Sequence, residues 1–308
     1  MRFGLTTPVV TLVPRSHAAW EADAGPAELR AIVQAADRFG YHHVSCSEHV
    51  GIPSEVAKVR GGRYYDPAAT LGFFAAISER IRLLTHVVVL PYHHPLALAK
   101  RYGTLDVLSG GRVILGVGVG SLREEFELLG VDFDARGARY VDALQALRAG
   151  LSGRTPSYAG THYRFSDFLI DPGAAQTRVP IWLGGRSPRS LRRALRYGDG
   201  WDPFHLTVAQ LRELLDRARD WPEWQQRAQP FDVALSPDAP LALETEADVE
   251  SAIAVVRLYE EIGATILNLR FRHRSLAHYL ELLERFAREV PTRLTRPTFV
   301  DNVQMTRK

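Results

Sequence analysis

The segment at residues 181–190 places a glycine turn between an apolar strand and a helix. It reads Ile-Trp-Leu-Gly-Gly-Arg-Ser-Pro-Arg-Ser, and Pro188 suits the first turn of a helix because its missing N–H costs nothing there. Gly184 and Gly185 allow the backbone to approach a ligand closely, and the start of the helix presents unpaired N–H groups. The segment is therefore a candidate phosphate-binding turn, and an ordinary strand-to-helix turn is the alternative.

Glu48 and His49 place a carboxylate and an imidazole together at the end of a predicted strand. Imidazole titrates near neutral pH and is the most common general acid or base in enzymes. His49, with Glu48 beside it, is therefore a candidate catalytic residue. A structural role, the more common one for a lone histidine, is the alternative.

A second glycine-rich segment, Gly116 to Ser121, follows another apolar strand. Its sequence, Gly-Val-Gly-Val-Gly-Ser, lacks the G-x-G-x-x-G spacing of a dinucleotide site, and no acidic residue ends a second strand about 20 residues later. Glycines at every second position leave one face of a strand bare, which suits a flat ring lying against the backbone. Close packing inside a barrel would favour the same glycines.

Motifs for metal binding and hydrolysis are missing from the sequence. The pairs His42-His43 and His93-His94 are adjacent and lack the i, i+4 spacing of zinc-binding histidines on a helix, so no metal site is predicted. The sequence contains neither a G-x-S-x-G elbow nor a Walker loop, which argues against a hydrolase and against a nucleoside triphosphatase.

The elements that would position these residues alternate along the chain. The predicted strands are Arg2–Thr6, His43–Cys46, Ile81–Leu90, Arg112–Val117, Val179–Leu183, Gly200–Phe204, Phe231–Leu235 and Thr265–Arg270. The predicted helices are Pro26–Phe39, Pro67–Arg80, Leu96–Leu108, Arg136–Ala149, Pro188–Tyr197, Thr207–Ala218, Glu244–Glu261 and Leu276–Phe286. Eight such units predict a single α/β domain, a (β/α)8 TIM barrel over residues 1–291, with an open doubly wound sheet as the rival. An inserted hairpin or ordered loop at residues 154–172 precedes the fifth strand, and residues 292–308 form a C-terminal tail.

Composition and charge indicate a soluble globular protein. The 308 residues carry a formal net charge of +3, but basic and acidic residues are interleaved, as in Arg212-Glu213 and Glu284-Arg285, so no nucleic-acid partner is expected. No apolar run approaches about 18 residues, so no membrane span is expected. The single cysteine, Cys46, is expected in the core. A strand pattern at the first residues leaves no room for a signal peptide, and we therefore expect a cytoplasmic protein.

Several short blocks, taken in order, resemble the luciferase-like oxidoreductases, a family of TIM barrels that use flavin or the deazaflavin coenzyme F420. The blocks are Ser47–His49, Tyr65–Leu71, Arg80–Val87, Asp106–Arg112, Leu115–Gly120, Pro180–Ser187 and Tyr197–Trp201. The F420-dependent branch is favoured by Gly120–Phe126 and Arg136–Arg139. The resemblance implies hydride transfer between coenzyme F420 and a small organic substrate, and a homodimer.

The resemblance also implies roles for residues at the strand ends. It implies a non-prolyl cis peptide bond at His86–Val87 that supports the cofactor ring, and a phosphate at the glycine turn. It places Glu48 near the polar edge of the ring and His49 near the reacting carbon. The predicted catalytic residues are thus His49 and Glu48. The predicted cofactor-binding residues are Thr85, His86, Val87, Gly118, Val119, Gly120, Ser121, Gly184, Gly185, Arg186 and Ser187.

One position departs from the family pattern. Sugar-phosphate dehydrogenases of this kind have a glutamate directly after the Gly-x-Gly of strand four, where this chain has Ser121, so their substrate is not carried over. Glu124 or Glu125 could replace the missing acid, or either could be a charge at a helix start.

Two other functions stay open. Tyr140 matches a phosphate contact of some FMN-using members, so an FMN-dependent monooxygenase that uses molecular oxygen is the first alternative. A barrel that binds a flavin-type ligand without turnover is the second. The side chains that could line a substrate pocket, or could serve only in packing, are Trp20, Tyr64, Tyr92, Phe204 and His273.

Overall fold

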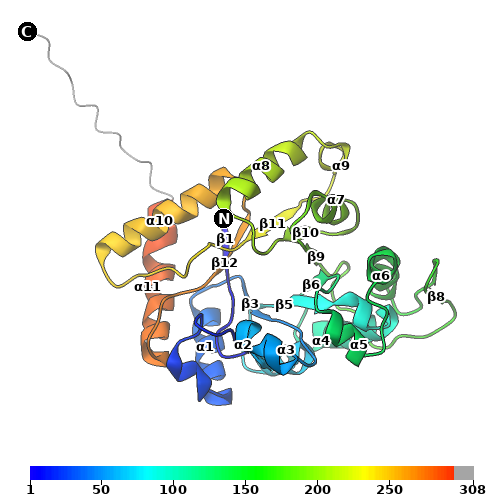
Figure 1. The fold of residues 1–308 in the computed structure, drawn as a ribbon, viewed down its shortest axis with the longest axis horizontal. Helices are drawn as coiled ribbons and strands as arrows, with labels where there is room; N and C mark the ends of the chain where they lie inside the picture. Colours follow the sequence, from blue (N-terminus) through cyan, green and yellow to red (C-terminus); the bar gives the residue numbers. More distant parts are fainter. Residues whose placement is uncertain (295–308) are drawn as a thin grey trace, which may run out of the picture.

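Eight parallel strands close into a barrel in the computed structural model, which describes residues 1–294 (Figure 1). In chain order they are β1 (Arg2–Leu5), β3 (His43–Cys46), β5 (Arg82–Val89), β6 (Val113–Gly118), β9 (Ile181–Gly184), β10 (Gly200–Asp202), β11 (Asp232–Leu235) and β12 (Ile266–Leu269). Hydrogen-bonded neighbours follow the order β1-β12-β11-β10-β9-β6-β5-β3, and β1 pairs with β3 to close the ring. The predicted (β/α)8 TIM barrel is confirmed, and the open-sheet alternative is wrong.

Helices surround the barrel on its outside (Figure 1). The eight that were predicted are α1 (Pro26–Arg38), α3 (Pro67–Ala76), α4 (Pro95–Leu108), α6 (Arg136–Gly150), α7 (Pro188–Tyr197), α8 (Val208–Arg219), α10 (Glu246–Glu261) and α11 (Leu276–Leu294). Proline stands in the first turn of α1, α3, α4 and α7, and Ser187 caps α7 by accepting the N–H of Ser190. Because such start signals are local in sequence, the helix starts could be predicted closely.

The interior of the barrel is filled by side chains. One buried cluster, with one member from each of five strands, is formed by Leu84, Ile114, Trp182, Ala234 and Ile266. Gly200 makes room for this cluster, because a Cβ there would lie 2.6 Å from the Trp182 ring. A filled interior leaves the ends of the strands as the place for a ligand.

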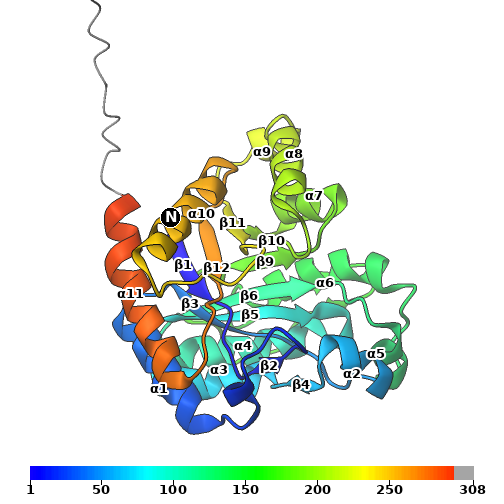
Figure 2. The same cartoon turned by 60° about the vertical axis from the view of Figure 1, so that its left-hand side comes forward.

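Shorter elements in the loops were not predicted. Strand β2 (Thr11–Leu12) pairs antiparallel with β4 (Arg63–Tyr64), and helix α2 (Ser54–Arg60) precedes β4; Figure 2 shows these elements together at one side of the barrel. Helix α5 (Arg123–Leu128) follows β6, α9 (Pro222–Gln225) follows α8, and 3-10 turns occupy Ala19–Ala22 and Leu90–Tyr92. The predicted insertion before β9 contains a hairpin, as expected, made of β7 (Tyr158–Ala159) and β8 (Arg164–Phe165).

The last helix differs most from its prediction. It was expected to end at Phe286, but α11 continues to Leu294 with Pro291 inside it. Phe286 and Val290 are both buried on one face of the helix, so packing maintains a helix that the proline alone would shorten. The remainder of the predicted tail, residues 295–308, lies outside the described residues. No helix within residues 1–294 is long and apolar enough to cross a membrane.

Candidate active site

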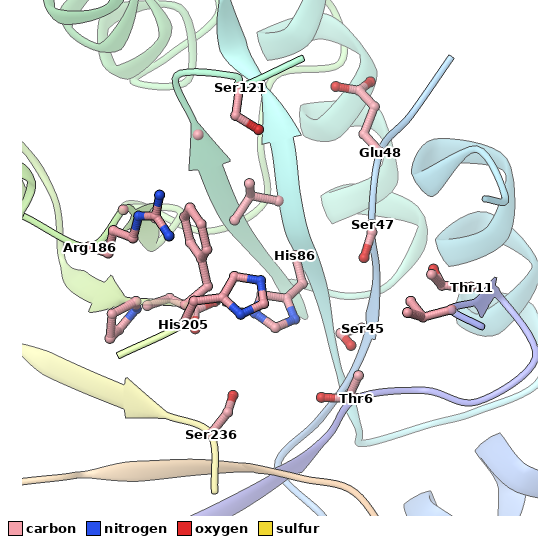
Figure 3. Close-up of a pocket in the computed structure, with 18 of the residues that line it drawn as sticks. Thr6, Thr11, Ser45, Ser47, Glu48, His86, Ser121, Arg186, His205 and Ser236 are labelled. Carbon is pink, nitrogen blue, oxygen red and sulfur yellow. Dashed lines mark ion pairs between the residues drawn. The ribbon is translucent and has the colours of Figure 1, made fainter. Parts of the chain in front are cut away.

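A cavity of about 780 Å³ lies at the carboxyl ends of the barrel strands. All eight strands, or the segments directly after them, contribute residues to its wall. Figure 3 shows Arg186 on one side of the cavity, Ser45 and Glu48 on the opposite side, and His86 between them. The volume is that of a site for a small molecule or cofactor.

The cavity brings together the predicted site residues except Thr85. Those that line it are Glu48, His49, His86, Val87, Gly118, Val119, Gly120, Ser121, Gly184, Gly185, Arg186 and Ser187. Thr85 is fully buried, and its hydroxyl donates to the backbone oxygen of Gly116 at 2.8 Å. The side chain of Thr85 joins β5 to β6 and is not among those that line the cavity, and its predicted cofactor contact stays a prediction.

Strand β5 is irregular where it meets the cavity. The His86–Val87 peptide bond is cis, as predicted, and the register between β5 and β6 shifts at this point. Val87 lies between two glycines: a Cβ at Gly118 would lie 2.7 Å from its Cγ2, and a Cβ at Gly184 would lie 3.5 Å from its Cγ1. Gly118 is therefore required to make room for Val87, and the resulting surface without polar side chains suits a flat ring.

The turn after β9 has the backbone expected of a site that approaches its ligand closely. Gly185 has a φ of +124°, and a Cβ at this position would lie 2.6 Å from Ser190. Three arginines of this turn and of α7, Arg186, Arg189 and Arg193, line the cavity. The start of α7 and these guanidinium groups together present positive charge to an anion.

His49 is held by a buried carboxylate. Its Nδ1 donates to Oε2 of Glu125 at 2.7 Å, and the Glu125 side chain is fully buried. Glu125 also accepts the hydroxyl of Tyr92 at 2.9 Å and the backbone N–H of Val50. Burial alone would raise the pKa of Glu125, but the hydrogen bond and charge of His49, with the other donors, lower it below its ordinary value. Of the two acids that the sequence left open, Glu125 contacts His49 and Glu124 is exposed.

The remaining part of the His49 ring faces the cavity. Its side chain is 20% exposed, and Tyr64 packs edge-on against the ring at 4.5 Å between centroids. A carboxylate on Nδ1 fixes both the orientation and the tautomer of an imidazole, which leaves Nε2 to exchange a proton. The pair His49–Glu125 can therefore act as a general acid or base on a ligand in the cavity.

Glu48 uses both carboxylate oxygens to bind the end of β5 and the segment that follows it. Oε2 accepts the backbone N–H of Val89 at 2.7 Å, and Oε1 accepts Nε2 of His93 at 2.8 Å. Only 6% of Glu48 is exposed, although it contributes to the cavity wall. Glu48 thus fixes the segment after β5, next to His49, and its predicted catalytic role stays a prediction.

A second histidine of the cavity also has a carboxylate partner. Nε2 of His86 lies 3.0 Å from Oδ2 of Asp202, whose side chain is fully buried. Burial alone would lower the pKa of His86, but the charge of Asp202 raises it above its ordinary value. Asn268 donates to the other Asp202 oxygen at 3.1 Å. Asn268 was not predicted as a site residue, and the only signal for it in the sequence is a polar residue within an apolar strand.

Tyr140 and Ser121 have partners of their own. The hydroxyl of Tyr140 donates to the backbone oxygen of Val117 at 3.1 Å, although the residue also lines the cavity. Ser121 is exposed, and its hydroxyl lies 3.5 Å from the Arg60 guanidinium on α2. The side chain that replaces the missing strand-four glutamate therefore contacts a loop helix and not His49.

The predicted aromatic lining is present in part. Tyr64, Tyr92, Phe204 and His273 line the cavity, whereas Trp20 does not. Trp20 instead donates its Nε1–H to Nδ1 of His273 at 3.0 Å. Within residues 1–294, no group of three or more His, Cys, Asp or Glu side chains is arranged to hold a metal ion.

Sequence comparison identifies relatives of this chain. A family model described as luciferase-like monooxygenase matches residues 1–297. Among curated proteins, 4-hydroxyprotoasukamycin monooxygenase of Streptomyces nodosus subsp. asukaensis is 37% identical over 192 residues. That match covers 60% of this chain and 49% of the relative, so the chain spans about half the length of that protein.

Solved structures share the fold. A monooxygenase from Streptomyces bottropensis has a TM-score of 0.75 and 22% identity, and the match covers 95% of this chain and 99% of that one. A coenzyme F420-dependent tetrahydromethanopterin reductase from Methanopyrus kandleri has a TM-score of 0.71 and 14% identity, with coverage of 95% and 99%. A monooxygenase and a coenzyme F420-dependent reductase are thus both similar to this chain in fold.

Proposed function

This chain belongs to the luciferase-like monooxygenase family, and we propose that it transfers a hydride between the deazaflavin coenzyme F420 and a small organic substrate. The observation that carries the proposal is the pairing of Glu125 with His49, because His49 lines the same cavity as Val87 and the glycine turn after β9. Hydride chemistry on a carbonyl or an alcohol requires a proton-exchanging group beside a bound ring.

The residues of the cavity fit a flavin-type cofactor. Val87 and Gly118 would support the ring, because their packing leaves a surface without polar side chains. Gly184, Gly185 and the start of α7 would hold the phosphate through backbone N–H groups and arginine charge. When bound, the deazaflavin would supply or accept the hydride, and the protein would provide orientation.

His49 would donate or accept the proton that accompanies the hydride. In the reducing direction, Nε2 would donate a proton to the substrate oxygen, and in the oxidising direction it would accept one. Glu125 would keep the ring of His49 oriented through Nδ1 and would balance the charge of the protonated imidazole. Both tasks are independent of which carbonyl or alcohol is the substrate.

Two features favour coenzyme F420 over FMN. The hydroxyl proton of Tyr140 is already donated to Val117, so this phenol is not available to donate to an FMN phosphate. The cluster Arg186, Arg189 and Arg193 provides more positive charge than one phosphate group requires. Coenzyme F420 carries carboxylates beyond its phosphodiester, and these would use the additional guanidinium groups.

An FMN-dependent monooxygenase that uses molecular oxygen is the second candidate. It is favoured by the 37% identity to a relative named as a monooxygenase. The same ring surface and phosphate turn would serve FMN.

Binding of both cofactors to the purified apo-protein tests the choice. We expect coenzyme F420 to bind more tightly than FMN, and His49→Ala to abolish hydride transfer while the dissociation constant of F420 stays the same. Tighter FMN binding, or oxygen consumption with reduced FMN, would establish the second candidate instead. If His49→Ala leaves turnover intact, the proposed acid–base role is wrong. Tight cofactor binding by a wild-type protein without any turnover would indicate a non-catalytic ligand-binding barrel.

A further inference from the structure

The ion pair between His86 and Asp202 belongs to a longer chain of buried polar groups. Asn268 donates from Nδ2 to Asp202 at 3.1 Å and accepts Nε2 of His43 at 2.9 Å on its amide oxygen. Nδ1 of His43 lies 2.9 Å from Nδ1 of His42. These groups lead from the cavity through the barrel toward the amino end of β3, where His43 begins the strand.

Both histidines at the end of this chain away from the cavity have lowered pKa values. Burial lowers the pKa of His43 well below its ordinary value, and the charges of His42 and His86 lower it further. Burial, followed by the charge of Arg2, lowers the pKa of His42 to about 3. Because His43 donates through Nε2, its Nδ1 accepts the proton of His42, and every donor in the chain points toward Asp202. Among the described residues, His86 is the cationic group that forms an ion pair with Asp202.

The two members of this ion pair differ in their access to the cavity. The Asp202 side chain is fully buried, whereas the His86 side chain is 21% exposed and extends into the space between the strand ends (Figure 3). Both residues line the cavity, but the side chain of the pair that is exposed there is that of His86. His86 also directly precedes Val87, the residue that would support the ring.

We propose that His86, held by Asp202, is a fixed positive group that binds the electronegative edge of the cofactor ring and favours the reduced cofactor over the oxidised one. The proposal rests on the proposed function, because it requires a flavin-type ring in the cavity. Uptake of two electrons and one proton converts the neutral flavin ring to a ring with one negative charge. A cation at the edge of the ring stabilises that added charge, and protein charges near the ring are a known way to tune a redox cofactor.

The groups that face His86 support a charged imidazole. Asp202 on β10 provides a negative charge at 3.0 Å, and its second oxygen is occupied by Asn268 on β12. His43 on β3 is the other titratable neighbour, and burial holds its pKa well below the ordinary value. The preference for the charged form of His86 therefore depends on the carboxylate of Asp202.

The first experiment measures the charge of His86 without any cofactor. Imidazole ¹⁵N and ¹³C NMR shifts of the apo-protein at about pH 7 report the protonation state, and His86→Gln assigns the signal. We expect a mostly charged His86 in the wild-type protein and a mostly neutral one in Asp202→Asn. A neutral His86 in the wild-type protein would overturn the proposal.

The second experiment measures the preference for the reduced ring. The dissociation constants of oxidised and reduced FMN are determined anaerobically, with coenzyme F420 as the probe if the wild-type protein binds only the deazaflavin. We expect His86→Gln and Asp202→Asn to weaken binding of the reduced probe about 10- to 100-fold more than binding of the oxidised probe. His162→Gln, at an exposed position of the hairpin before β9, is the matched control and should leave both constants unchanged.

The outcomes separate this inference from the proposed function. If the wild-type protein binds neither probe, the proposed function fails and this inference fails with it. If the wild-type protein binds a probe but His86→Gln weakens both redox states equally, His86 is only a packing or hydrogen-bonding residue. The proposed function then stands and the inference is wrong. If Asp202→Asn does not fold, His86→Gln alone decides, because Gln preserves a donor to Asp202 and removes only the charge.

Discussion

Histidines paired with carboxylates at this cavity do not share one electrostatic role. The pKa of His86 is raised, because the charge of Asp202 outweighs the effect of burial. The pKa of His273 is lowered, because burial outweighs the charge of Glu21, 3.5 Å away. Trp20 donates to Nδ1 of His273, which also favours its neutral form. His273 therefore fastens the loop after β12 to the loop after β1, whereas His86 presents charge to the cavity.

Glu125 is expected to act through His49 rather than on the substrate. Glu125→Gln retains an oxygen that accepts from Nδ1 but removes the charge that balances a protonated imidazole. We expect kcat to fall about 10- to 100-fold, with KM and the dissociation constant of the cofactor nearly unchanged. Steady-state kinetics together with a binding titration would measure this separation.

Glu124 provides the matched control for that substitution. It precedes Glu125 in α5 but is exposed, so Glu124→Gln should leave kcat and KM at their wild-type values. Glu125→Asp should restore part of the activity lost in Glu125→Gln, because it restores the charge. Equal losses in kcat for the Glu124 and Glu125 variants would show that the effect belongs to the helix and not to the contact with His49.

Tyr140 distinguishes the two cofactor hypotheses. Its hydroxyl donates to Val117, so Tyr140→Phe should cost about 1 kcal/mol of stability by leaving that carbonyl without its donor. We expect the dissociation constant of coenzyme F420 to stay within about twofold of the wild-type value, because no phosphate contact is lost. An increase of about tenfold in the dissociation constant of FMN would instead identify a phenol–phosphate contact and favour the monooxygenase.

At the level of elements, β5 and β6 form the surface on which a ring would lie. Their contact is close because Gly116 and Gly118 have no side chain: a Cβ at Gly116 would lie 2.0 Å from the Thr85 backbone oxygen. The side chain of Val87 occupies the space beside Gly118. The sequence left two interpretations of the alternating glycines open, and each applies to a different glycine. Gly116 allows close packing of the strands, and Gly118 leaves a bare face toward the cavity.

Substitution of Gly118 tests the cavity side of this pair of strands. A Cβ in Gly118→Ala would lie 2.7 Å from Cγ2 of Val87, so Val87 must move into the region proposed for the ring. We expect a loss of about 1–3 kcal/mol in stability and an increase of about tenfold in the dissociation constant of the cofactor. Denaturant unfolding and a binding titration measure the two effects.

Gly72 provides a contrasting glycine. It lies within α3, and a Cβ there would meet no atom within 4 Å. Gly72→Ala should therefore stabilise the protein by about 0.5–1 kcal/mol and leave cofactor binding unchanged. An unchanged dissociation constant in Gly118→Ala, measured beside this control, would place the ring elsewhere in the cavity.

The elements were predictable because their signals are local. Pro188 and Ser187 mark the start of α7 within a few residues, and the Gly184–Gly185 turn is adjacent to them in the chain. Helix α2 and the β2–β4 pair were missed because they are short. In this pair, Thr11 of β2 lies opposite Tyr64 of β4. These two residues are too far apart in the sequence for a short window to contain both.

The partners of the site residues could not be predicted for the same reason. Glu125 lies 76 positions from His49, and the pairing of β3 with β5 and of β5 with β6 places the two together. The sequence alone did not distinguish Glu124 from Glu125. The two differ in the side of α5 on which each lies, and only the structure shows this. Glu48 was assigned a catalytic role from its position beside His49, but the backbone N–H of Val89 and the ring of His93 occupy its oxygens.

Across the whole molecule, carboxylates with lowered pKa values connect elements that are distant in sequence. Each accepts backbone N–H groups from a segment at least 18 positions away, and burial alone would raise its pKa. The members of this set are Asp37, Glu125, Asp142 and Asp199. Because hydrogen bonds and nearby charges outweigh burial at each of them, the folded protein binds protons more weakly than the unfolded chain. Stability is therefore expected to decrease in acid.

Asp199 is the member of this set for which we predict the clearest pH dependence. Burial would raise its pKa, but Arg148 at 2.5 Å, the Ile181 N–H and Arg178 lower it below 3.8. A lowered folded pKa adds stability that is complete above the unfolded value and is lost as pH falls through the folded one. Asp199→Asn should thus cost about 2–3 kcal/mol in urea unfolding at about pH 7, and clearly less at about pH 3. The exposed Asp216→Asn should change little at either pH. A cost for Asp199→Asn that is equal at both pH values would mean that packing, not charge, makes Asp199 important.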